Sequence, residues 1–202
     1  EIFGEPDESP QNEHASLNPR NPYGVAKAYG HLITGNYRQR FGLFAVSGIL
    51  YNHESPRRGM EFVTRKISHT VAKIKAGTAQ DLHLGNLDAQ RDWGFAGDYV
   101  QAMWLMLQQD QPADYVIGTG ELHSVRELCQ IAFGVVGLDY RDYVVEDQTY
   151  YRPAEKFPLV ADPTFARASL GWQPEVNFEA LIRMMIESDL KGVAKDTRRL
   201  PV

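Results

Sequence analysis

The chain has 202 residues, of which 43% are hydrophobic and 23% are charged, an ordinary balance for a globular domain. The formal net charge of −5 argues against a nucleic-acid partner bound by general basicity, and no apolar run is long enough to predict a membrane span. The single cysteine, Cys129, excludes a disulfide framework within the chain, so we expect a small buried thiol and a reducing, cytoplasmic compartment.

The first predicted helix begins at Pro22 and runs to about Arg40. Residues 1–20 are polar and rich in turn formers, which indicates a loop leading into it. Asn21 is a good N-cap residue, and Gly42 is suited to the C-cap. Apolar residues recur near helical spacing, which predicts that much of the helix surface is buried; they are Val25, Tyr29, Leu32, Ile33, Tyr37 and Phe41.

Strands are predicted to alternate with helices along the rest of the chain. Residues 43–51 (LFAVSGILY) are typical of a strand covered on both faces in a parallel sheet. Further short strands are predicted at 81–85, 114–118 and 143–146. Further helices are predicted at 60–77, 99–109 and 124–132, from 162, and from 177 to about Leu190. Ser124 and Glu127 form a capping box at the start of the third of these, and Asn177 is the predicted N-cap of the last. This alternation favours an α/β fold with a smaller mixed lobe.

Tyr23 and Lys27 are four positions apart, so a helix places them one turn apart on the same face. A nearby ammonium stabilises a phenolate and lowers a tyrosine pKa that is ordinarily near ~10. Such a pair can therefore do proton chemistry. The same pattern also arises often on surface helices, so a plain solvated pair is the alternative.

Polar and basic loops follow the predicted strands, where open α/β sheets bind their ligands. Asn52 to Arg58 follows an apolar strand, and with Arg65 and Lys66 it makes a basic island in an acidic chain. Such an island suits phosphate, although a solvated, salt-bridged face is an equal alternative. His53 has no partner at metal-ligand spacing, so no metal site is predicted, and no glycine-rich dinucleotide fingerprint is visible.

Seven segments are informative when they are taken together: Glu1–Gly4, Asn21–Lys27, Gly48–Gly59, Phe62–Lys66, Leu84–Leu87, Arg91–Gly94 and Arg152–Glu155. The stretches NHESPRRG and FVTRK are the most specific of them. The segments resemble the GDP-mannose 4,6-dehydratases of the extended short-chain dehydrogenase/reductase family, whereas the Tyr–Lys pair alone is shared with the whole superfamily.

The resemblance implies the C-terminal part of a Rossmann-type doubly wound parallel sheet plus a smaller mixed α/β substrate-binding lobe. Residues 1–60 would then be the remainder of the NADP-binding domain. Residues 61–190 would form mainly the substrate lobe, with some segments returning to the first domain, and residues 191–202 a frayed tail.

The resemblance also implies a reaction, the conversion of GDP-D-mannose to GDP-4-dehydro-6-deoxy-D-mannose, which feeds GDP-fucose or GDP-rhamnose synthesis. Tyr23 would be the base at the 4-hydroxyl, assisted by Lys27, and Glu1 would remove the C5 proton. NADP would be oxidant and then reductant, contacted by Tyr23, Lys27, His53 and Arg58. The positions that match the nucleotide-sugar pocket are Asn52, Lys66, Arg91, Arg152 and Glu155.

The family's N-terminal dinucleotide-binding half has no counterpart in this sequence. We therefore expect the chain to be the C-terminal part of a longer enzyme and to be inactive alone. The family implies a homodimer or homotetramer with the Tyr23 helix in the interface. Two alternatives remain: a GDP-4-keto-6-deoxymannose reductase, against which Glu1 and NHESPRRG argue, and a non-catalytic nucleotide-sugar-binding or oligomerisation module.

Overall fold

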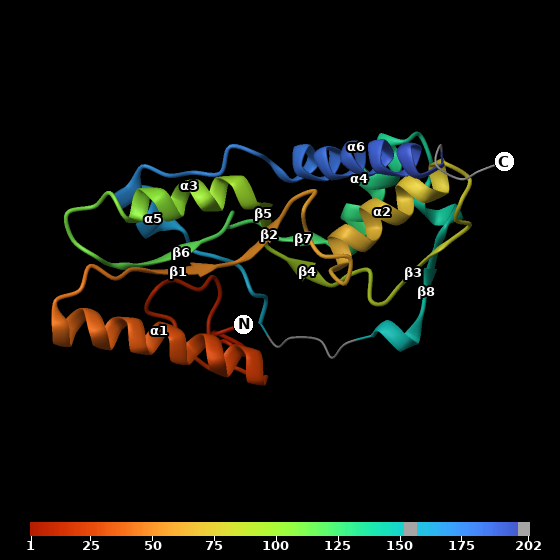
Figure 1. The fold of residues 1–202 in the computed structure, drawn as a ribbon. Helices are drawn as coiled ribbons and strands as arrows, with labels where there is room; N and C mark the ends of the chain where they lie inside the picture. The colour runs from red at the N-terminus through yellow and green to blue at the C-terminus, as the bar shows by residue number, and fades with distance from the viewer. Residues whose placement is uncertain (152–156, 198–202) are drawn as a thin grey trace. The chain divides into compact units, whose positions relative to one another are not determined.

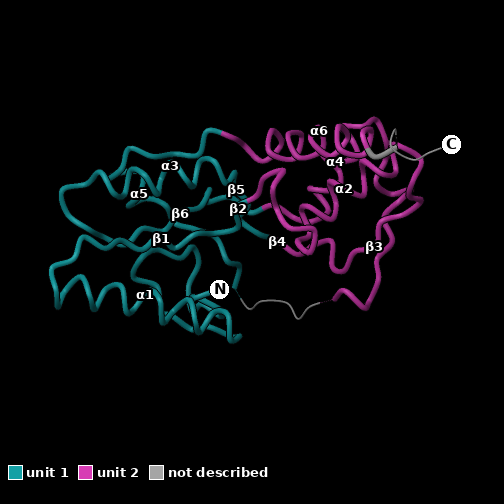
Figure 2. Tube along the Cα trace, in the orientation of Figure 1, with its two compact units in different colours: residues 1–53, 91–122, 155–175 teal, residues 54–90, 123–154, 176–202 magenta. Residues whose placement is uncertain are grey.

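The computed structural model describes residues 1–151 and 157–197, and Figure 1 shows their helices and strands. The chain divides into two compact units, which Figure 2 shows in different colours. Unit 1 comprises residues 1–53, 91–122 and 155–175, and unit 2 comprises residues 54–90, 123–154 and 176–202. Each unit therefore joins three segments that are far apart in the sequence.

Unit 1 is built on two parallel strands. β1 (Ser47–Leu50) pairs with β6 (Asp114–Ile117) in a register that sets Ser47 opposite Asp114. α1 (Pro22–Phe41) lies along one face of this pair, and α3 (Ala96–Met106) and α5 (Thr164–Leu170) lie on the other (Figure 1). Further strands in unit 1 or at its chain boundaries are β2 (Asn52–Glu54), β4 (Gln90–Arg91) and β5 (Trp93–Phe95).

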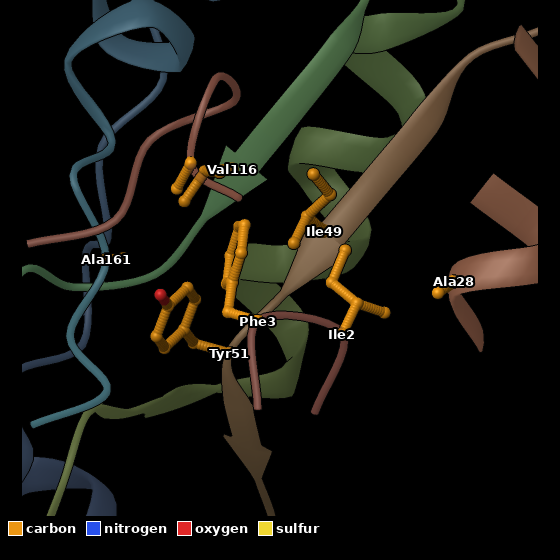
Figure 3. Packing of buried hydrophobic residues seen from close by; sticks show 8 residues of the cluster. Ile2, Phe3, Ala28, Ile49, Tyr51, Val116 and Ala161 are labelled. Atoms are coloured by element: carbon orange, nitrogen blue, oxygen red, sulfur yellow. The ribbon is translucent and has the colours of Figure 1, made fainter. Parts of the chain in front are cut away.

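The core under α1 draws apolar residues from four distant parts of the sequence. Figure 3 shows Ile2 and Phe3 next to β1, with the Phe3 ring 6.3 Å from that of Tyr51. The cluster comprises Ile2, Phe3, Ala15, Ala28, Ile49, Tyr51, Val116 and Ala161. Burial of Ile2 and Phe3 fixes the first residues of the chain against the sheet, and therefore also the position of Glu1.

Unit 2 contains a helical layer and a second parallel strand pair. α2 (Val63–Lys75), α4 (Val125–Val135) and α6 (Phe178–Thr197) pack against one another, and β3 (Leu82–Leu84) pairs with β8 (Val144–Glu146). β7 (His123–Ser124) and the 3-10 helices η1 (Tyr140–Asp142) and η2 (Gln148–Tyr150) complete the described elements.

A buried carboxylate ties α2 to α6 in unit 2. Asp189 pairs with Arg65 and accepts a 2.7 Å hydrogen bond from the hydroxyl of Ser68. Arg65 neutralises the buried charge and Ser68 hydrogen-bonds to it, so both side chains of α2 link that helix to α6.

Parallel pairing and helices on both faces of β1 and β6 confirm the predicted α/β class. The predicted caps are also confirmed. Asn21 Oδ1 accepts from the amide of Gly24 at 2.7 Å, and Gly42 closes α1 at φ 63°. Ser124 caps α4, accepting from the amide of Glu127 at 3.0 Å, and Asn177 caps α6.

The expected burial of α1 is wrong in this chain. Only Gly24 and Ala28 of α1 are buried, because these small residues make the close contact between α1 and the rest of unit 1. The large apolar side chains point away: Tyr29 is 66% exposed and Leu32 is 61% exposed. The apolar stretch at 43–51 also forms a shorter strand than expected, since β1 begins at Ser47.

The last helix runs beyond its predicted end near Leu190 and reaches Thr197, with Val193 buried in its last turns. Among the described residues, no helix has both the length and the apolarity to cross a membrane. Cys129 on α4 is a free, fully buried thiol, as expected, and burial raises its pKa to about 12. The proposed roles of residues 1–60 and 61–190 in cofactor and substrate binding stay a prediction.

Candidate active site

The start of α1 is tied to the first residue of the chain by one side chain. The side-chain nitrogen Nδ2 of Asn21 donates a 2.6 Å hydrogen bond to Oε2 of Glu1, while the side-chain oxygen Oδ1 caps the helix. Gly24 lets the two segments approach, because an added Cβ there would lie 2.7 Å from the carbonyl oxygen of Glu1. The Glu1 carboxylate is therefore fixed at the N-terminus of α1.

The segment that carries Glu1 is held along its length. The amide of Asn18 donates to the carbonyl of Ile2, and the amide of Glu5 donates to the carbonyl of Asn18, each at 3.1 Å. Gly4 has φ +56°, and a Cβ there would lie 1.9 Å from the Asn18 oxygen, so only glycine fits. Residues 1–5 thus form a fixed strap rather than a loose end.

Tyr23 and Lys27 lie on the exposed face of the same helix turn. Lys27 Nζ is 5.6 Å from the centroid of the Tyr23 ring, and the Tyr23 side chain is 61% exposed. Within the described part of the chain, the Lys27 ammonium has no carboxylate partner. A carboxylate, a phenol and an ammonium therefore lie near the start of one helix. The sequence predicts the placing of the phenol of Tyr23 and the ammonium of Lys27 on one face of it.

Asn52 and His53 follow β1 on β2, where the sequence places them. His53 Nδ1 lies 2.8 Å from the carbonyl oxygen of Tyr51. Because a carbonyl only accepts, Nδ1 carries the proton, and Nε2 is the nitrogen left for a ligand. The His53 ring packs 5.7 Å from that of Tyr99, which fixes its plane.

Arg91 is followed by a buried carboxylate that fixes the local backbone. Asp92 is 1% exposed and accepts hydrogen bonds from the amides of Thr119, Gly120 and Ala161 at 2.9, 3.0 and 3.1 Å. These bonds join three distant segments of unit 1 beside Arg91. The backbone beside the half-buried Arg91 is therefore held in place by the hydrogen bonds of Asp92.

Arg58 and Lys66 belong to unit 2. Arg58 Nε lies 3.3 Å from a carboxylate oxygen of Glu54, and its guanidinium carbon lies 3.4 Å from the Phe62 ring centroid. Lys66 Nζ donates a 2.6 Å hydrogen bond to the carbonyl of His83 and lies 3.9 Å from the Tyr150 ring centroid. Burial lowers the pKa of Lys66, and the charge of Asp147 opposes this effect.

The predicted site residues that the structure describes fall into three groups. Glu1, Tyr23 and Lys27 are brought together at the start of α1. The others in unit 1 are Asn52, His53 and Arg91, whereas Arg58 and Lys66 lie in unit 2. Arg152 and Glu155 lie outside the described residues. No group of three histidine, cysteine or acidic side chains able to hold a metal occurs within 1–151 and 157–197.

The basic island proves to be partly structural, since Arg65 is used by the buried Asp189. The sequence identifies Asn21 as a cap but carries no sign of its second bond to Glu1. The sequence also indicates no role for Glu54. Glu54 and Arg58 are four positions apart, a spacing that predicts an ion pair only within a helix, and this segment is a strand end and turn.

Comparison with known proteins gives a consistent result. A family model described as GDP-mannose 4,6 dehydratase matches residues 1–185. GDP-mannose 4,6 dehydratase 2 of Arabidopsis thaliana is 53% identical over 191 residues, covering 95% of this chain and 51% of the relative. The Homo sapiens GDP-mannose 4,6 dehydratase is 48% identical over 208 residues, covering 95% of this chain and 56% of the relative. The chain thus spans about half the length of these curated relatives.

Solved structures share the fold. RMD from Pseudomonas aeruginosa, in complex with NADPH, superposes with a TM-score of 0.87 at 23% identity, covering 95% of this chain and 64% of that one. The UDP-glucose 4-epimerase of Thermus thermophilus, in complex with NAD, has a TM-score of 0.78 at 28% identity, covering 93% of this chain and 60% of that one. The Rossmann-type architecture expected from the sequence is therefore confirmed.

Proposed function

Because this chain belongs to the GDP-mannose 4,6-dehydratase family, we propose that it carries the catalytic groups that convert GDP-D-mannose to GDP-4-dehydro-6-deoxy-D-mannose and water. The observation that carries the proposal is the grouping of Glu1, Tyr23 and Lys27 at the start of α1. A dehydration beside a transient sugar ketone needs one base for a hydroxyl and another for a carbon acid. A phenolate and a carboxylate supply both.

The side chains available fit NADP as the cofactor. The Lys27 ammonium, without a carboxylate partner in the described residues, can donate to ribose hydroxyls beside Tyr23. His53 offers its second ring nitrogen, and Arg58 offers guanidinium donors suited to a phosphate. When bound, NADP supplies the transient oxidation at C4 and the later reduction at C6.

The proton steps then belong to this chain. Tyr23 accepts the proton of the sugar 4-hydroxyl, and the Lys27 ammonium stabilises the phenolate form that this requires. The ketone at C4 acidifies the C5 proton, which Glu1 removes and passes to the departing C6 hydroxyl, so that water leaves. Asn21 keeps the Glu1 carboxylate at the helix start, so its orientation is set before the sugar arrives.

For the nucleotide sugar, we assign binding roles to Asn52, Lys66 and Arg91, joined by Arg152 and Glu155 from outside the described residues. Lys66 is partly desolvated, which strengthens its attraction for an anionic group. The free, buried thiol of Cys129 supports a cytoplasmic location, where the product feeds GDP-deoxysugar synthesis.

A second copy of the chain is the partner we assign to α1. Its exposed apolar side chains form a row that would be costly to leave in water, and dimerisation through α1 would cover it. The row consists of Val25, Tyr29, Leu32, Tyr37 and Phe41, which are 54%, 66%, 61%, 47% and 57% exposed.

The test of the reaction is Glu1→Gln in the native protein that contains this sequence, incubated with GDP-mannose in D₂O. Deuterium uptake at C5 and formation of the 4-keto-6-deoxy product are followed. Loss of a general base predicts a fall in both rates of about 10²- to 10⁴-fold, with GDP-mannose binding retained.

Glu5→Gln is the matched control, since Glu5 is a nearby carboxylate whose recorded ion pair, with Arg20, is a weak one at 3.9 Å. It is expected to leave both rates unchanged. Product formation at the wild-type rate in Glu1→Gln would overturn the assignment of Glu1. Tight binding of GDP-mannose without any turnover by the wild type would instead favour a non-catalytic binding module.

A further inference from the structure

A buried carboxylate at the end of β2 is not used by the reaction described above. Glu54 is 1% exposed, and its carboxylate accepts a hydrogen bond from the hydroxyl of Thr64, which is also buried. The same carboxylate faces the Nε of Arg58 at 3.3 Å. A buried charge is costly unless it is neutralised, so this arrangement makes Arg58 the counter-charge of Glu54.

Arg58 is held on a second side by an aromatic ring. Its guanidinium carbon lies 3.4 Å from the ring centroid of Phe62, a stacking distance. The Arg58 side chain is 21% exposed, so it is partly buried but still accessible to a ligand. Carboxylate and ring together fix both the direction and the plane of the guanidinium.

This fixation uses one part of the guanidinium and leaves another for a ligand. Nε is the guanidinium nitrogen that lies 3.3 Å from the Glu54 carboxylate, in an ion pair without hydrogen-bond geometry, and the two terminal amino groups donate no hydrogen bond to another described residue. Terminal amino groups of a planar guanidinium are the donors that grip two phosphate oxygens at once. Because the arginine has already lost its rotamer freedom, binding costs less entropy than with a mobile side chain.

We propose that Glu54 is a positioning residue that, together with Phe62, presents Arg58 to a phosphate group of a nucleotide ligand. The proposal rests on the proposed function for the kind of ligand, and its chemistry is shared by NADP and GDP-mannose. Glu54 acts through Arg58 and does not touch the ligand. Substitution of Glu54 should therefore have no further effect on ligand affinity once Arg58 has been replaced.

A double-mutant cycle on the native protein tests this dependence. Dissociation constants are measured for NADPH and, separately, for GDP in the wild type, Glu54→Gln, Arg58→Lys and the double variant. Glu54→Gln keeps the shape and an acceptor for Thr64 but loses the charge facing Arg58. We expect each single variant to weaken one of the two ligands about tenfold, and the double variant to be no weaker than Arg58→Lys.

The two ligands separate the possible sources of the phosphate. Weakening confined to NADPH assigns Arg58 to the cofactor, and weakening confined to GDP assigns it to the substrate; both support the proposal. Unchanged affinity for both ligands in Glu54→Gln, or additive losses in the double variant, would overturn it. Turnover is not needed for this readout, so failure of the dehydratase assignment would be recognised separately, as absence of product from GDP-mannose.

Two further variants guard against a purely structural effect. Phe62→Leu, at a side chain that is 40% exposed, removes the ring with little risk to folding and is expected to weaken the same ligand as Glu54→Gln. Glu61→Gln, an exposed carboxylate in the same segment, is the matched control and is expected to bind both ligands as the wild type does. A Phe62→Leu variant with unchanged affinities would contradict the role of the ring.

Discussion

The side-chain amide of Asn21 donates a 2.6 Å hydrogen bond to Glu1 while its oxygen accepts one from the amide of Gly24. One residue therefore caps α1 and also holds the carboxylate that we assign to the C5 proton. The two tasks use opposite ends of the same amide, so substitutions can separate them.

Asn21→Asp keeps a capping oxygen but replaces the donor to Glu1 with a second negative charge. Aspartate caps helices about as well as asparagine, so we expect the free energy of unfolding to change by less than ~0.5 kcal/mol. Turnover of GDP-mannose is expected to fall about tenfold, because the Glu1 carboxylate loses its orientation. Urea unfolding and steady-state assays measure the two effects independently.

Asn177 provides the control for this separation, since its side chain caps α6 at 2.9 Å and we give it no part in the site. Asn21→Ala and Asn177→Ala should each cost about 1 kcal/mol of stability. Only Asn21→Ala should also reduce turnover. Equal turnover in both alanine variants would show that the bond from Asn21 to Glu1 has no catalytic consequence.

Gly24→Ala tests the close approach of the two segments. The new Cβ would lie 2.7 Å from the Glu1 carbonyl oxygen and 3.0 Å from Cβ of Pro19, so the strap must shift. We expect lower turnover and a lower melting temperature. Gly30→Ala, in the same helix with open space around it, should instead be neutral or stabilising by up to ~1 kcal/mol. The idea fails if Gly24→Ala is as active and as stable as Gly30→Ala.

The local structure of this chain follows closely from its sequence. The N-cap at Asn21, the glycine end at Gly42 and the cap at Ser124 are decided by neighbouring residues, and all are found. The Tyr23–Lys27 pair follows from helical geometry in the same way. Such features depend on a few adjacent positions, so pattern reasoning reaches them.

Tertiary relationships are the part that the pattern does not contain. The apolar spacing of α1 predicts burial, yet spacing does not say whether the partner surface lies in the same chain, and Leu32 is 61% exposed. The hydrogen bond from Asn21 to Glu1 and the ion pair between Arg58 and Glu54 depend on the path that the backbone takes, which the residue pattern does not give. The continuation of α6 past Leu190 likewise involves a tertiary contact, the burial of Val193, which the residue pattern does not show.

If the exposed apolar row on α1 forms the proposed dimer interface, a charged residue placed in it should lower the molecular mass of the protein in solution. Leu32→Glu places a carboxylate in the middle of the row, and we expect the proposed dimer to dissociate, because burying an unpaired charge costs several kcal/mol. Leu107→Glu is the matched control, since Leu107 is 56% exposed and follows α3. Light scattering after gel filtration measures the mass. An unchanged mass for Leu32→Glu would exclude α1 as the interface.

The buried hydroxyl of Tyr51 predicts a dependence of stability on alkaline pH. It donates a 2.7 Å hydrogen bond to Gln11, and burial, assisted by the charge of Asp92, raises the pKa of Tyr51 well above its ordinary value of 10.0. The folded state therefore keeps this proton at pH values where the unfolded chain releases it. The resulting stabilisation is complete below pH 10 and declines as the pH rises from there toward the raised pKa.

Tyr51→Phe removes both the hydrogen bond and this titration. At pH 8 we expect a loss of about 1 kcal/mol in the free energy of unfolding, because Gln11 loses a donor. Between about pH 10 and pH 11.5 the wild type should lose stability more steeply than the variant, so the difference between them shrinks. Urea titrations across this range measure both slopes. Tyr29→Phe, at an exposed tyrosine, should keep the wild-type slope, and parallel curves for wild type and Tyr51→Phe would contradict the raised pKa.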